Sequence, residues 1–149
     1  MWLLRAAVTL AVVGLASVAS ISADGATQRA GTAACSGTIG ITQLHFVPPS
    51  VARGGGSAAH VAAQSCTDQS QSTELTWLGR FRGKHFSGCP VIDPLAQHAT
   101  FRPDGTFKAK LTYSLPSSCT ASRLQVTVRF SGSGGTQLAE KSADLSITL

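Results

Sequence analysis

The stretch FKAKLTYSL, residues 107–115, alternates apolar and polar side chains from end to end. Side chains on a β-strand point to opposite faces in turn, so this pattern predicts a strand with one buried and one solvated face. Pro103-Asp104-Gly105, just before it, favours a tight turn, because proline presets φ and glycine tolerates positive φ. The same alternation recurs on either side, in LTWLGRF at 75–81 and RLQVTVRF at 123–130. A period of two, with no competing helical period, therefore decides the fold class as all-β.

Seven short stretches with this period follow one another beyond residue 37. They cover residues 39–46, 59–64, 75–82, 99–101, 107–115, 123–130 and 138–149. Breaks of phase near Gln43 and Glu140 predict bulges. His60 and Gln64 are expected to face outward, and Leu149 to face the core. Seven strands of this kind are typical of two stacked antiparallel sheets, and 149 residues suit one such domain.

The N-terminal segment has the pattern of a secretory signal peptide. Arg5 precedes an uncharged, mostly apolar run over residues 6–19. That run is shorter than the roughly 20 residues that a membrane-spanning helix needs, so no permanent membrane span is expected. Small residues allow cleavage after Ala19 or after Ala23. We therefore predict a signal peptide within residues 1–23 and a protein that is secreted or held in the cell envelope, outside the cytoplasmic membrane.

Residues 24–36 are predicted to form a flexible leader, and residues 37–149 the folded domain. Within the leader, Thr-Ala-Ala-Cys at 32–35 resembles the signal at which the first mature cysteine of a lipoprotein receives a diacylglycerol. Cys35 therefore has two possible fates, a lipid anchor or a disulfide bond.

Four cysteines in an exported chain suggest two disulfide bonds. If successive strands run up and down, Cys35 and Cys66 lie at one end of the sandwich. Cys89 and Cys119 then lie at the opposite end. Because bonded cysteines need Cα atoms within about 7 Å, we predict the pairs Cys35 with Cys66 and Cys89 with Cys119. The chain has no Cys-x-x-Cys and no histidine at ligand spacing, so a zinc site is not expected.

Several short motifs carry a resemblance to known proteins. They are QSCT at 64–67, WLGRF at 77–81, Cys89-Pro90 and SCT at 118–120. With them the chain resembles small uncharacterised exported proteins of high-GC actinobacteria. Its strand spacing, inward Trp77 and Pro-Asp-Gly turn also resemble bacterial secreted immunoglobulin-like domains. The resemblance implies a seven-stranded antiparallel immunoglobulin-like sandwich and no particular activity. It departs from antibody domains because no cysteine occupies the inward positions of the second and sixth strands.

The residues needed for catalysis do not form a recognisable set, so we expect no enzyme and no catalytic residues. Only seven acids are present, placed in turns, loops and strand surfaces, and no Gly-x-Ser-x-Gly motif occurs. His45 and His60 are expected to be cross-strand neighbours on an outer surface, able at most to bind a metal weakly. No cofactor and no metal centre is predicted.

The chain is basic, with a formal charge of +5. In an immunoglobulin-like sandwich the third, sixth and seventh strands share a sheet, which would gather outward arginines on one face. The candidate binding residues are Arg80, Arg82, Arg123, Arg129 and the loop residue Phe86. Guanidinium groups suit carboxylates and phosphates, so an anionic envelope polymer, a lipid headgroup or an acidic secreted protein is a conceivable partner. Nucleic acid is not expected, because exposed aromatic residues are not interleaved with the basic ones.

The leading hypothesis is a non-catalytic secreted binding or structural module. The alternative is an inhibitor or modulator of a secreted enzyme, which would act through the disulfide-pinned loop at residues 84–94. A hydrolase is the third hypothesis.

Overall fold

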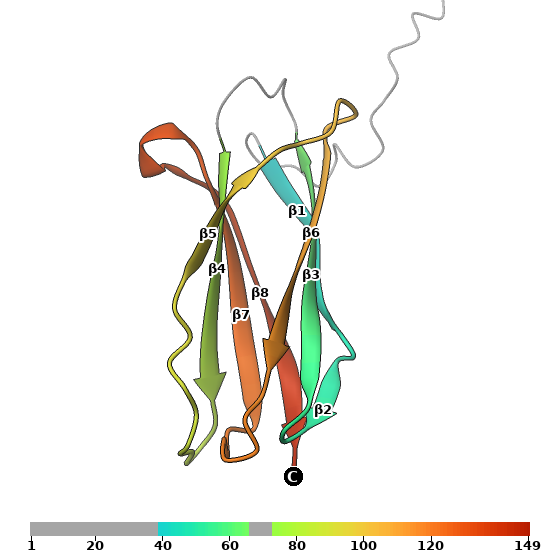
Figure 1. Ribbon diagram of the computed structural model, residues 1–149. Helices are drawn as coiled ribbons and strands as arrows, with labels where there is room; N and C mark the ends of the chain where they lie inside the picture. The colour runs from blue at the N-terminus through green and yellow to red at the C-terminus, as the bar shows by residue number, and fades with distance from the viewer. Residues whose placement is uncertain (1–38, 66–72) are drawn as a thin grey trace, which may run out of the picture.

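The computed structural model describes residues 39–65 and 73–149, which form two β-sheets packed face to face (Figure 1). The smaller sheet has the order β1-β3-β6, with β1 at Ile39–Val47, β3 at Gly56–Ser65 and β6 at Thr106–Ser114. The larger sheet has the order β2-β8-β7-β4-β5, with β2 at Ser50–Ala52, β8 at Gln137–Thr148, β7 at Arg123–Ser131, β4 at Thr73–Arg82 and β5 at Leu95–Ala99. The prediction of an all-β chain with two packed sheets is confirmed.

The core follows the alternation along the strands. On β7 the apolar residues Leu124, Val126, Val128 and Phe130 have no exposed surface, and the polar residues between them face solvent. Trp77 on the neighbouring strand β4 is equally enclosed, with 1% of its surface exposed. Burial of such side chains contributes roughly 1.5–3 kcal/mol each and holds the two sheets together.

Aromatic rings connect the sheets. Phe107 of β6 meets Phe130 of β7 edge to face, with ring centroids 5.5 Å apart. Phe101, in the connection between β5 and β6, lies 5.3 Å from Phe107 and 5.9 Å from Phe130. Because edge-to-face and tilted rings attract each other, these contacts fix β6 against the larger sheet.

The predicted turn before β6 is formed as its residues suggest. Gly105 has φ +80°, and its N–H donates to the carbonyl of Arg102 at 2.8 Å. The Asp104 carboxylate accepts hydrogen bonds from the Thr106 hydroxyl at 2.6 Å and from the Thr106 N–H at 2.9 Å. These bonds, that from the hydroxyl above all, lower the pKa of Asp104.

The strand inventory differs from the prediction in two respects. The described residues contain eight strands rather than seven, because Ser50–Ala52 forms β2 and pairs in parallel with the end of β8. The strand expected at 99–101 lies earlier in the chain, at Leu95–Ala99, where it pairs with the first half of β4. The sheet grouping is as expected, since the predicted third, sixth and seventh strands correspond to β4, β7 and β8.

Two residue orientations were predicted wrongly. Gln64 is buried rather than outward, because it lies beneath the turn before β6 and its amide donates to the carbonyl of Asp104 at 3.2 Å. Leu149 lies beyond the end of β8 and is 96% exposed. The bulge near Gln43 is confirmed by a register shift between Ile41 and Gln43. The bulge expected near Glu140 lies at Leu138, which the pairing of β7 with β8 skips.

The predicted signal peptide, the leader and the pair Cys35 with Cys66 lie outside the described residues. The first residue of β1, Ile39, pairs with the last residue of β3, Ser65, so the ends of these two strands are adjacent. The bond between Cys35 and Cys66 remains a prediction. No helix in the part of the chain that the structure describes is long and apolar enough to cross a membrane.

Candidate functional site

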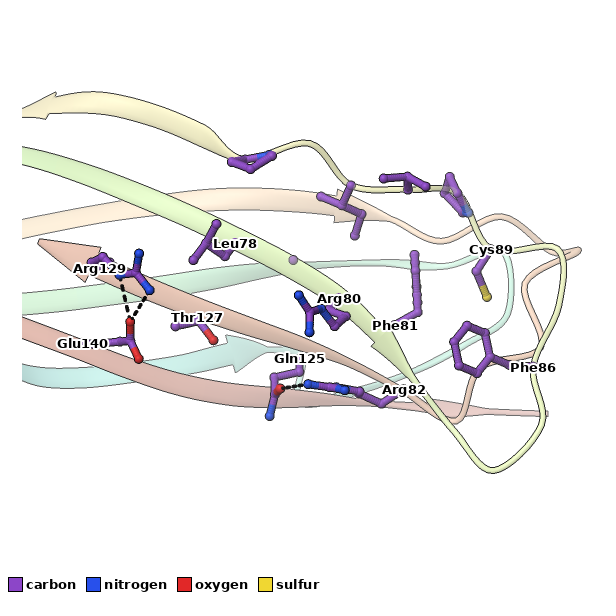
Figure 2. A pocket seen from close by; sticks show the side chains of 15 residues that line it. Leu78, Arg80, Phe81, Arg82, Phe86, Cys89, Gln125, Thr127, Arg129 and Glu140 are labelled. Carbon is purple, nitrogen blue, oxygen red and sulfur yellow. Dashed lines mark hydrogen bonds and ion pairs between the residues drawn. The ribbon is translucent and has the colours of Figure 1, made fainter. Parts of the chain in front are cut away.

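A groove of about 540 Å³ runs along the outer face of the larger sheet (Figure 2). The neighbouring strands β4 and β7 form its floor, and the loop between β4 and β5 forms one wall. The residues that line it include Leu78, Arg80, Arg82, Phe86, Cys89, Ile92, Gln125, Thr127, Arg129 and Glu140. Arg129 and Phe86 lie at opposite ends of the groove, with Arg80 between them. Four of the five predicted binding residues are therefore brought together.

The wall of the groove is fixed by a disulfide bond. Cys89 and Cys119 are bonded, with Cα atoms 4.3 Å apart, which confirms this predicted pair. The backbone beside the bond is also joined, because the Thr120 N–H donates to the Ser87 carbonyl at 3.0 Å and the Ser87 N–H to the Thr120 hydroxyl at 2.8 Å. Gly88 has φ +66°, and a Cβ there would collide with the Ser118 carbonyl. The loop is thus held tightly against the connection between β6 and β7.

The wall also depends on a missing side chain. Gly79 occupies an inward position on β4, and a Cβ there would come within 2.9–3.3 Å of the Ile92 side chain. Ile92 therefore occupies the space next to the strand and packs against the core. The absence of a side chain at Gly79 lets the loop lie close to the sheet.

Two of the predicted arginines are neutralised within the sheet. Arg129 lies opposite Glu140, and its Nη2 and Nε are 2.8 and 2.9 Å from Glu140 Oε2. Arg123 Nη1 is 3.5 Å from Asp144 Oδ2. Arg123 is not among the residues that line the groove. Exposed ion pairs of this kind contribute about 0–1 kcal/mol, but they lower the positive charge that an anion would meet.

The other two arginines carry the charge of the groove. Arg82 lies opposite Arg123, a like-charge pair that is unfavourable on a sheet, and its Nη2 donates to Gln125 Oε1 at 3.1 Å. Arg80 is exposed and has no ion-pair partner within the described ranges. Figure 2 shows Arg80 on the open face of β4, with interaction lines only at Arg82 and Arg129. Arg80 is therefore the free guanidinium of the site.

Sequence reasoning missed the partners of these arginines. Alternation places Gln125 and Thr127 on the outer face with Arg129, and that signal was available. The pairing of Arg129 with Glu140 depends on the register between β7 and β8, which the bulge at Leu138 sets. No local pattern gives that register.

The histidine pair lies on the other sheet. His45 and His60 face each other across β1 and β3, as predicted, with rings stacked at 5.7 Å and 17° between their planes. Over residues 39–65 and 73–149, no three side chains of the metal-binding types gather into a group that could hold an ion.

Comparison with known proteins adds a likeness of fold alone. No protein-family model matches the sequence, and no curated protein matches it significantly. The chain is similar in structure to the alkylpurine DNA glycosylase AlkC of Pseudomonas fluorescens bound to DNA with an abasic site analog, with TM-score 0.51, 12% identity and 76% of this chain covered. It spans only 31% of that protein.

Two further structures are similar over the same share of this chain, 76%. A Niemann-Pick type C2 protein from the Japanese carpenter ant has TM-score 0.43 and 11% identity, with 96% of its own chain covered. The sporulation control protein Spo0M of Bacillus subtilis has TM-score 0.46 and 13% identity, with 51% of its chain covered.

Proposed function

We propose that the chain is a secreted, non-catalytic, immunoglobulin-like binding module whose contact surface is the groove beside β4. Its ligand is anionic. The observation that carries the proposal is the position of Arg80, a free guanidinium at the centre of a groove of about 540 Å³ with a disulfide-pinned wall. Small-ligand sites have volumes of roughly 300–1,000 Å³, so the groove can hold one residue or sugar unit of a larger molecule.

The chemistry of the lining defines the ligand further. The planar guanidinium of Arg80 binds a carboxylate or phosphate through two parallel hydrogen bonds. Phe86 is 46% exposed and lies at the loop end of the groove, where it offers an apolar surface. Thr127 adds a hydroxyl on the floor. A ligand with a negative group beside an apolar or ring portion fits this arrangement, which favours an anionic envelope polymer or an acidic segment of a protein.

The test is the binding of the purified protein to an immobilised carboxylated polysaccharide, with and without the free guanidinium. Arg80→Gln should weaken binding at least fivefold, since among the described arginines that line the groove only Arg80 has neither an ion pair nor a side-chain hydrogen bond. Arg102→Gln is the matched control, because Arg102 is also exposed but lies in the turn before β6. It should change affinity less than twofold. Equal losses in both variants would mean that only net charge matters, and unchanged binding of the Arg80 variant would reject the groove.

A second function is favoured by the loop itself. Val91, on the disulfide-pinned loop, is 91% exposed. A pinned loop with an exposed apolar residue suits an inhibitor or modulator that inserts into a secreted enzyme. Val91→Ser should then abolish capture of a secreted protein. Val91 also lines the groove, but this substitution adds no charge, so polysaccharide affinity should change less than twofold. Capture that survives this substitution would count against the inhibitor.

A further inference from the structure

The outer face of the smaller sheet carries a second hollow, of about 340 Å³. Cross-strand register places its outward side chains in two adjacent rows over β1, β3 and β6. One row is His45, His60 and Lys110, and the next is Gln43, Ala62 and Lys108. All six line the hollow. The pattern arises because the three strands run side by side with aligned alternation, although their residues are far apart in the sequence.

The hollow exists because the middle position of the second row is small. Ala62 lies between Gln43 and Lys108, so its methyl group leaves a depression among longer side chains. The stacked rings of His45 and His60 border it, and Lys108 and Lys110 lie along β6 on the other side. Both lysines are exposed and have no ion-pair partner in the described part of the chain.

Within the three strands that form the hollow, no acidic residue opposes these cations. The strands β1, β3 and β6 contain no Asp or Glu. The strand β8 packs against β1 and carries Glu140, Lys141 and Asp144. Its two acids are paired with Arg129 and Arg123 on the outer face of the larger sheet. The hollow therefore has a formal charge of +2 with neutral histidines, and +4 when both imidazoles are protonated.

We propose that this hollow is a binding site for a multiply charged phosphate group, and that binding takes up protons at His45 and His60. Lysine binds phosphate as a point charge, and the amide of Gln43 can donate a further hydrogen bond. A carboxylate would be better matched by the planar fork of an arginine, and the hollow has none. A metal ion is disfavoured because Lys110 lies directly beside His60 in the register.

The two stacked imidazoles make the site sensitive to pH. Histidine changes its charge between about pH 5 and 8. Two protonated rings in a stack repel each other, and a bound dianion or trianion offsets that repulsion. Anion binding and protonation therefore favour each other, so phosphate binds more tightly at pH 5.5 than at pH 7.5.

The experiment is calorimetric titration of the purified protein with pyrophosphate and, separately, with long-chain polyphosphate at 50 mM salt. The variant Lys108→Gln/Lys110→Gln should bind pyrophosphate at least tenfold more weakly. The matched control is Lys141→Gln/Arg102→Gln, which removes two exposed positive charges elsewhere and should change affinity less than twofold. Equal losses in the two double variants, or no binding of either probe, would overturn the site.

The proton linkage is tested with His45→Gln/His60→Gln. Tightening between pH 7.5 and pH 5.5 should be at least threefold smaller in this variant than in the parent. The protonation of the ligand itself is the same in both titrations and cancels in the comparison. Equal tightening would reject the role of the histidines.

Two results identify the source of the phosphate and separate this site from the groove. Binding of both probes indicates recognition of a free phosphate group, whereas binding of polyphosphate alone indicates a polymer. Arg80→Gln should leave pyrophosphate affinity unchanged. If it weakens pyrophosphate as much as the double lysine variant does, the phosphate binds in the groove and the second site is wrong.

Discussion

The outer faces of the two sheets differ in how their positive charge is held. On the larger sheet, four arginines share a face with the carboxylates of Glu74, Glu140 and Asp144, which leaves a formal charge of +1. On the smaller sheet, Lys108 and Lys110 share the outer face of three strands that contain no Asp or Glu. The face with more cations is thus the less positive one. The acids on each face, and not the number of cations alone, decide the net charge that a ligand meets.

The faces differ in shape as well. The larger sheet has a wall, because the disulfide-pinned loop lies beside β4, and its groove is larger than the hollow over β3, about 540 against 340 Å³. The groove can therefore select ligands by shape, and the hollow mainly by charge. Exposed charges are screened within about 10 Å at 0.1 M salt, so binding to the smaller sheet should weaken more steeply as salt rises.

The largest effect expected is that of breaking the wall of the groove. Cys89→Ser/Cys119→Ser opens a loop closed across 30 residues and should lower the free energy of unfolding by about 3 kcal/mol. Polysaccharide binding in the groove should fall, while pyrophosphate binding to the other sheet stays the same. Urea denaturation and the two titrations measure this. Substitution is preferable to a reducing agent, which would also break a bond between Cys35 and Cys66. A variant with intact groove affinity would show that the wall is held without the bond.

A smaller effect is expected at Tyr113, on the inner face of the strand that carries both lysines. Its hydroxyl is buried and has no hydrogen-bond partner among the described residues. An unsatisfied buried hydroxyl is costly, so Tyr113→Phe should raise the free energy of unfolding by about 1 kcal/mol. Pyrophosphate binding on the outer face should not change. A loss of stability would instead indicate that a buried water holds the hydroxyl.

The same residue gives a pH test. Burial raises the pKa of Tyr113 to about 12. Because the folded pKa lies above the unfolded one, this group leaves the free energy of unfolding unchanged below about pH 10. The free energy of unfolding then falls as the pH rises toward 12. Tyr113 is the only tyrosine of the chain, so its absorbance near 295 nm reports this group alone. The midpoint should lie near pH 12 in the folded protein and near pH 10 in urea.

Much of the fold could be predicted because alternation records which side chains are buried. Leu124 to Phe130 show this directly, as every second residue is enclosed. The up-and-down order of successive strands also located the bond between Cys89 and Cys119. The end of the sandwich at which a loop lies depends only on how many strands precede it. Ser50–Ala52 could not be found in this way. Three residues are too few to show a period, and their partner is the distant end of β8.

The candidate sites were predictable only in part. Alternation along the strands, with the expected sheet grouping, placed Arg80, Arg82 and Arg129 on one face and His45 beside His60. It could not show that Glu140 neutralises Arg129, because a one-residue bulge at Leu138 sets that pairing. Nor could it show the row from His60 to Lys110, because β6 joins β3 although β4 and β5 intervene in the sequence.

The smallest effect is expected from removing an acid from the outer face of the larger sheet, so that one of its arginines becomes unpaired like the lysines of the smaller sheet. Glu140→Gln removes the acid that holds Arg129 at 2.8 Å and leaves a second free guanidinium in the groove. Affinity for the carboxylated polysaccharide should rise about threefold, the gain that corresponds to an exposed ion pair of somewhat less than 1 kcal/mol. The free energy of unfolding should fall by less than about 1 kcal/mol.

Glu74→Gln is the control for this change. It alters the net charge by the same amount on the same face, but the Glu74 carboxylate accepts a hydrogen bond from the Thr76 hydroxyl, forms no ion pair among the described residues and does not line the groove. Its effect on polysaccharide affinity should be less than half that of Glu140→Gln when binding is measured by biolayer interferometry at one salt concentration. Equal gains would mean that the larger sheet responds to total charge alone. A larger gain at Glu140 would mean that the ion pair between Arg129 and Glu140 lowers the positive charge available in the groove. The register between β7 and β8 sets that pair.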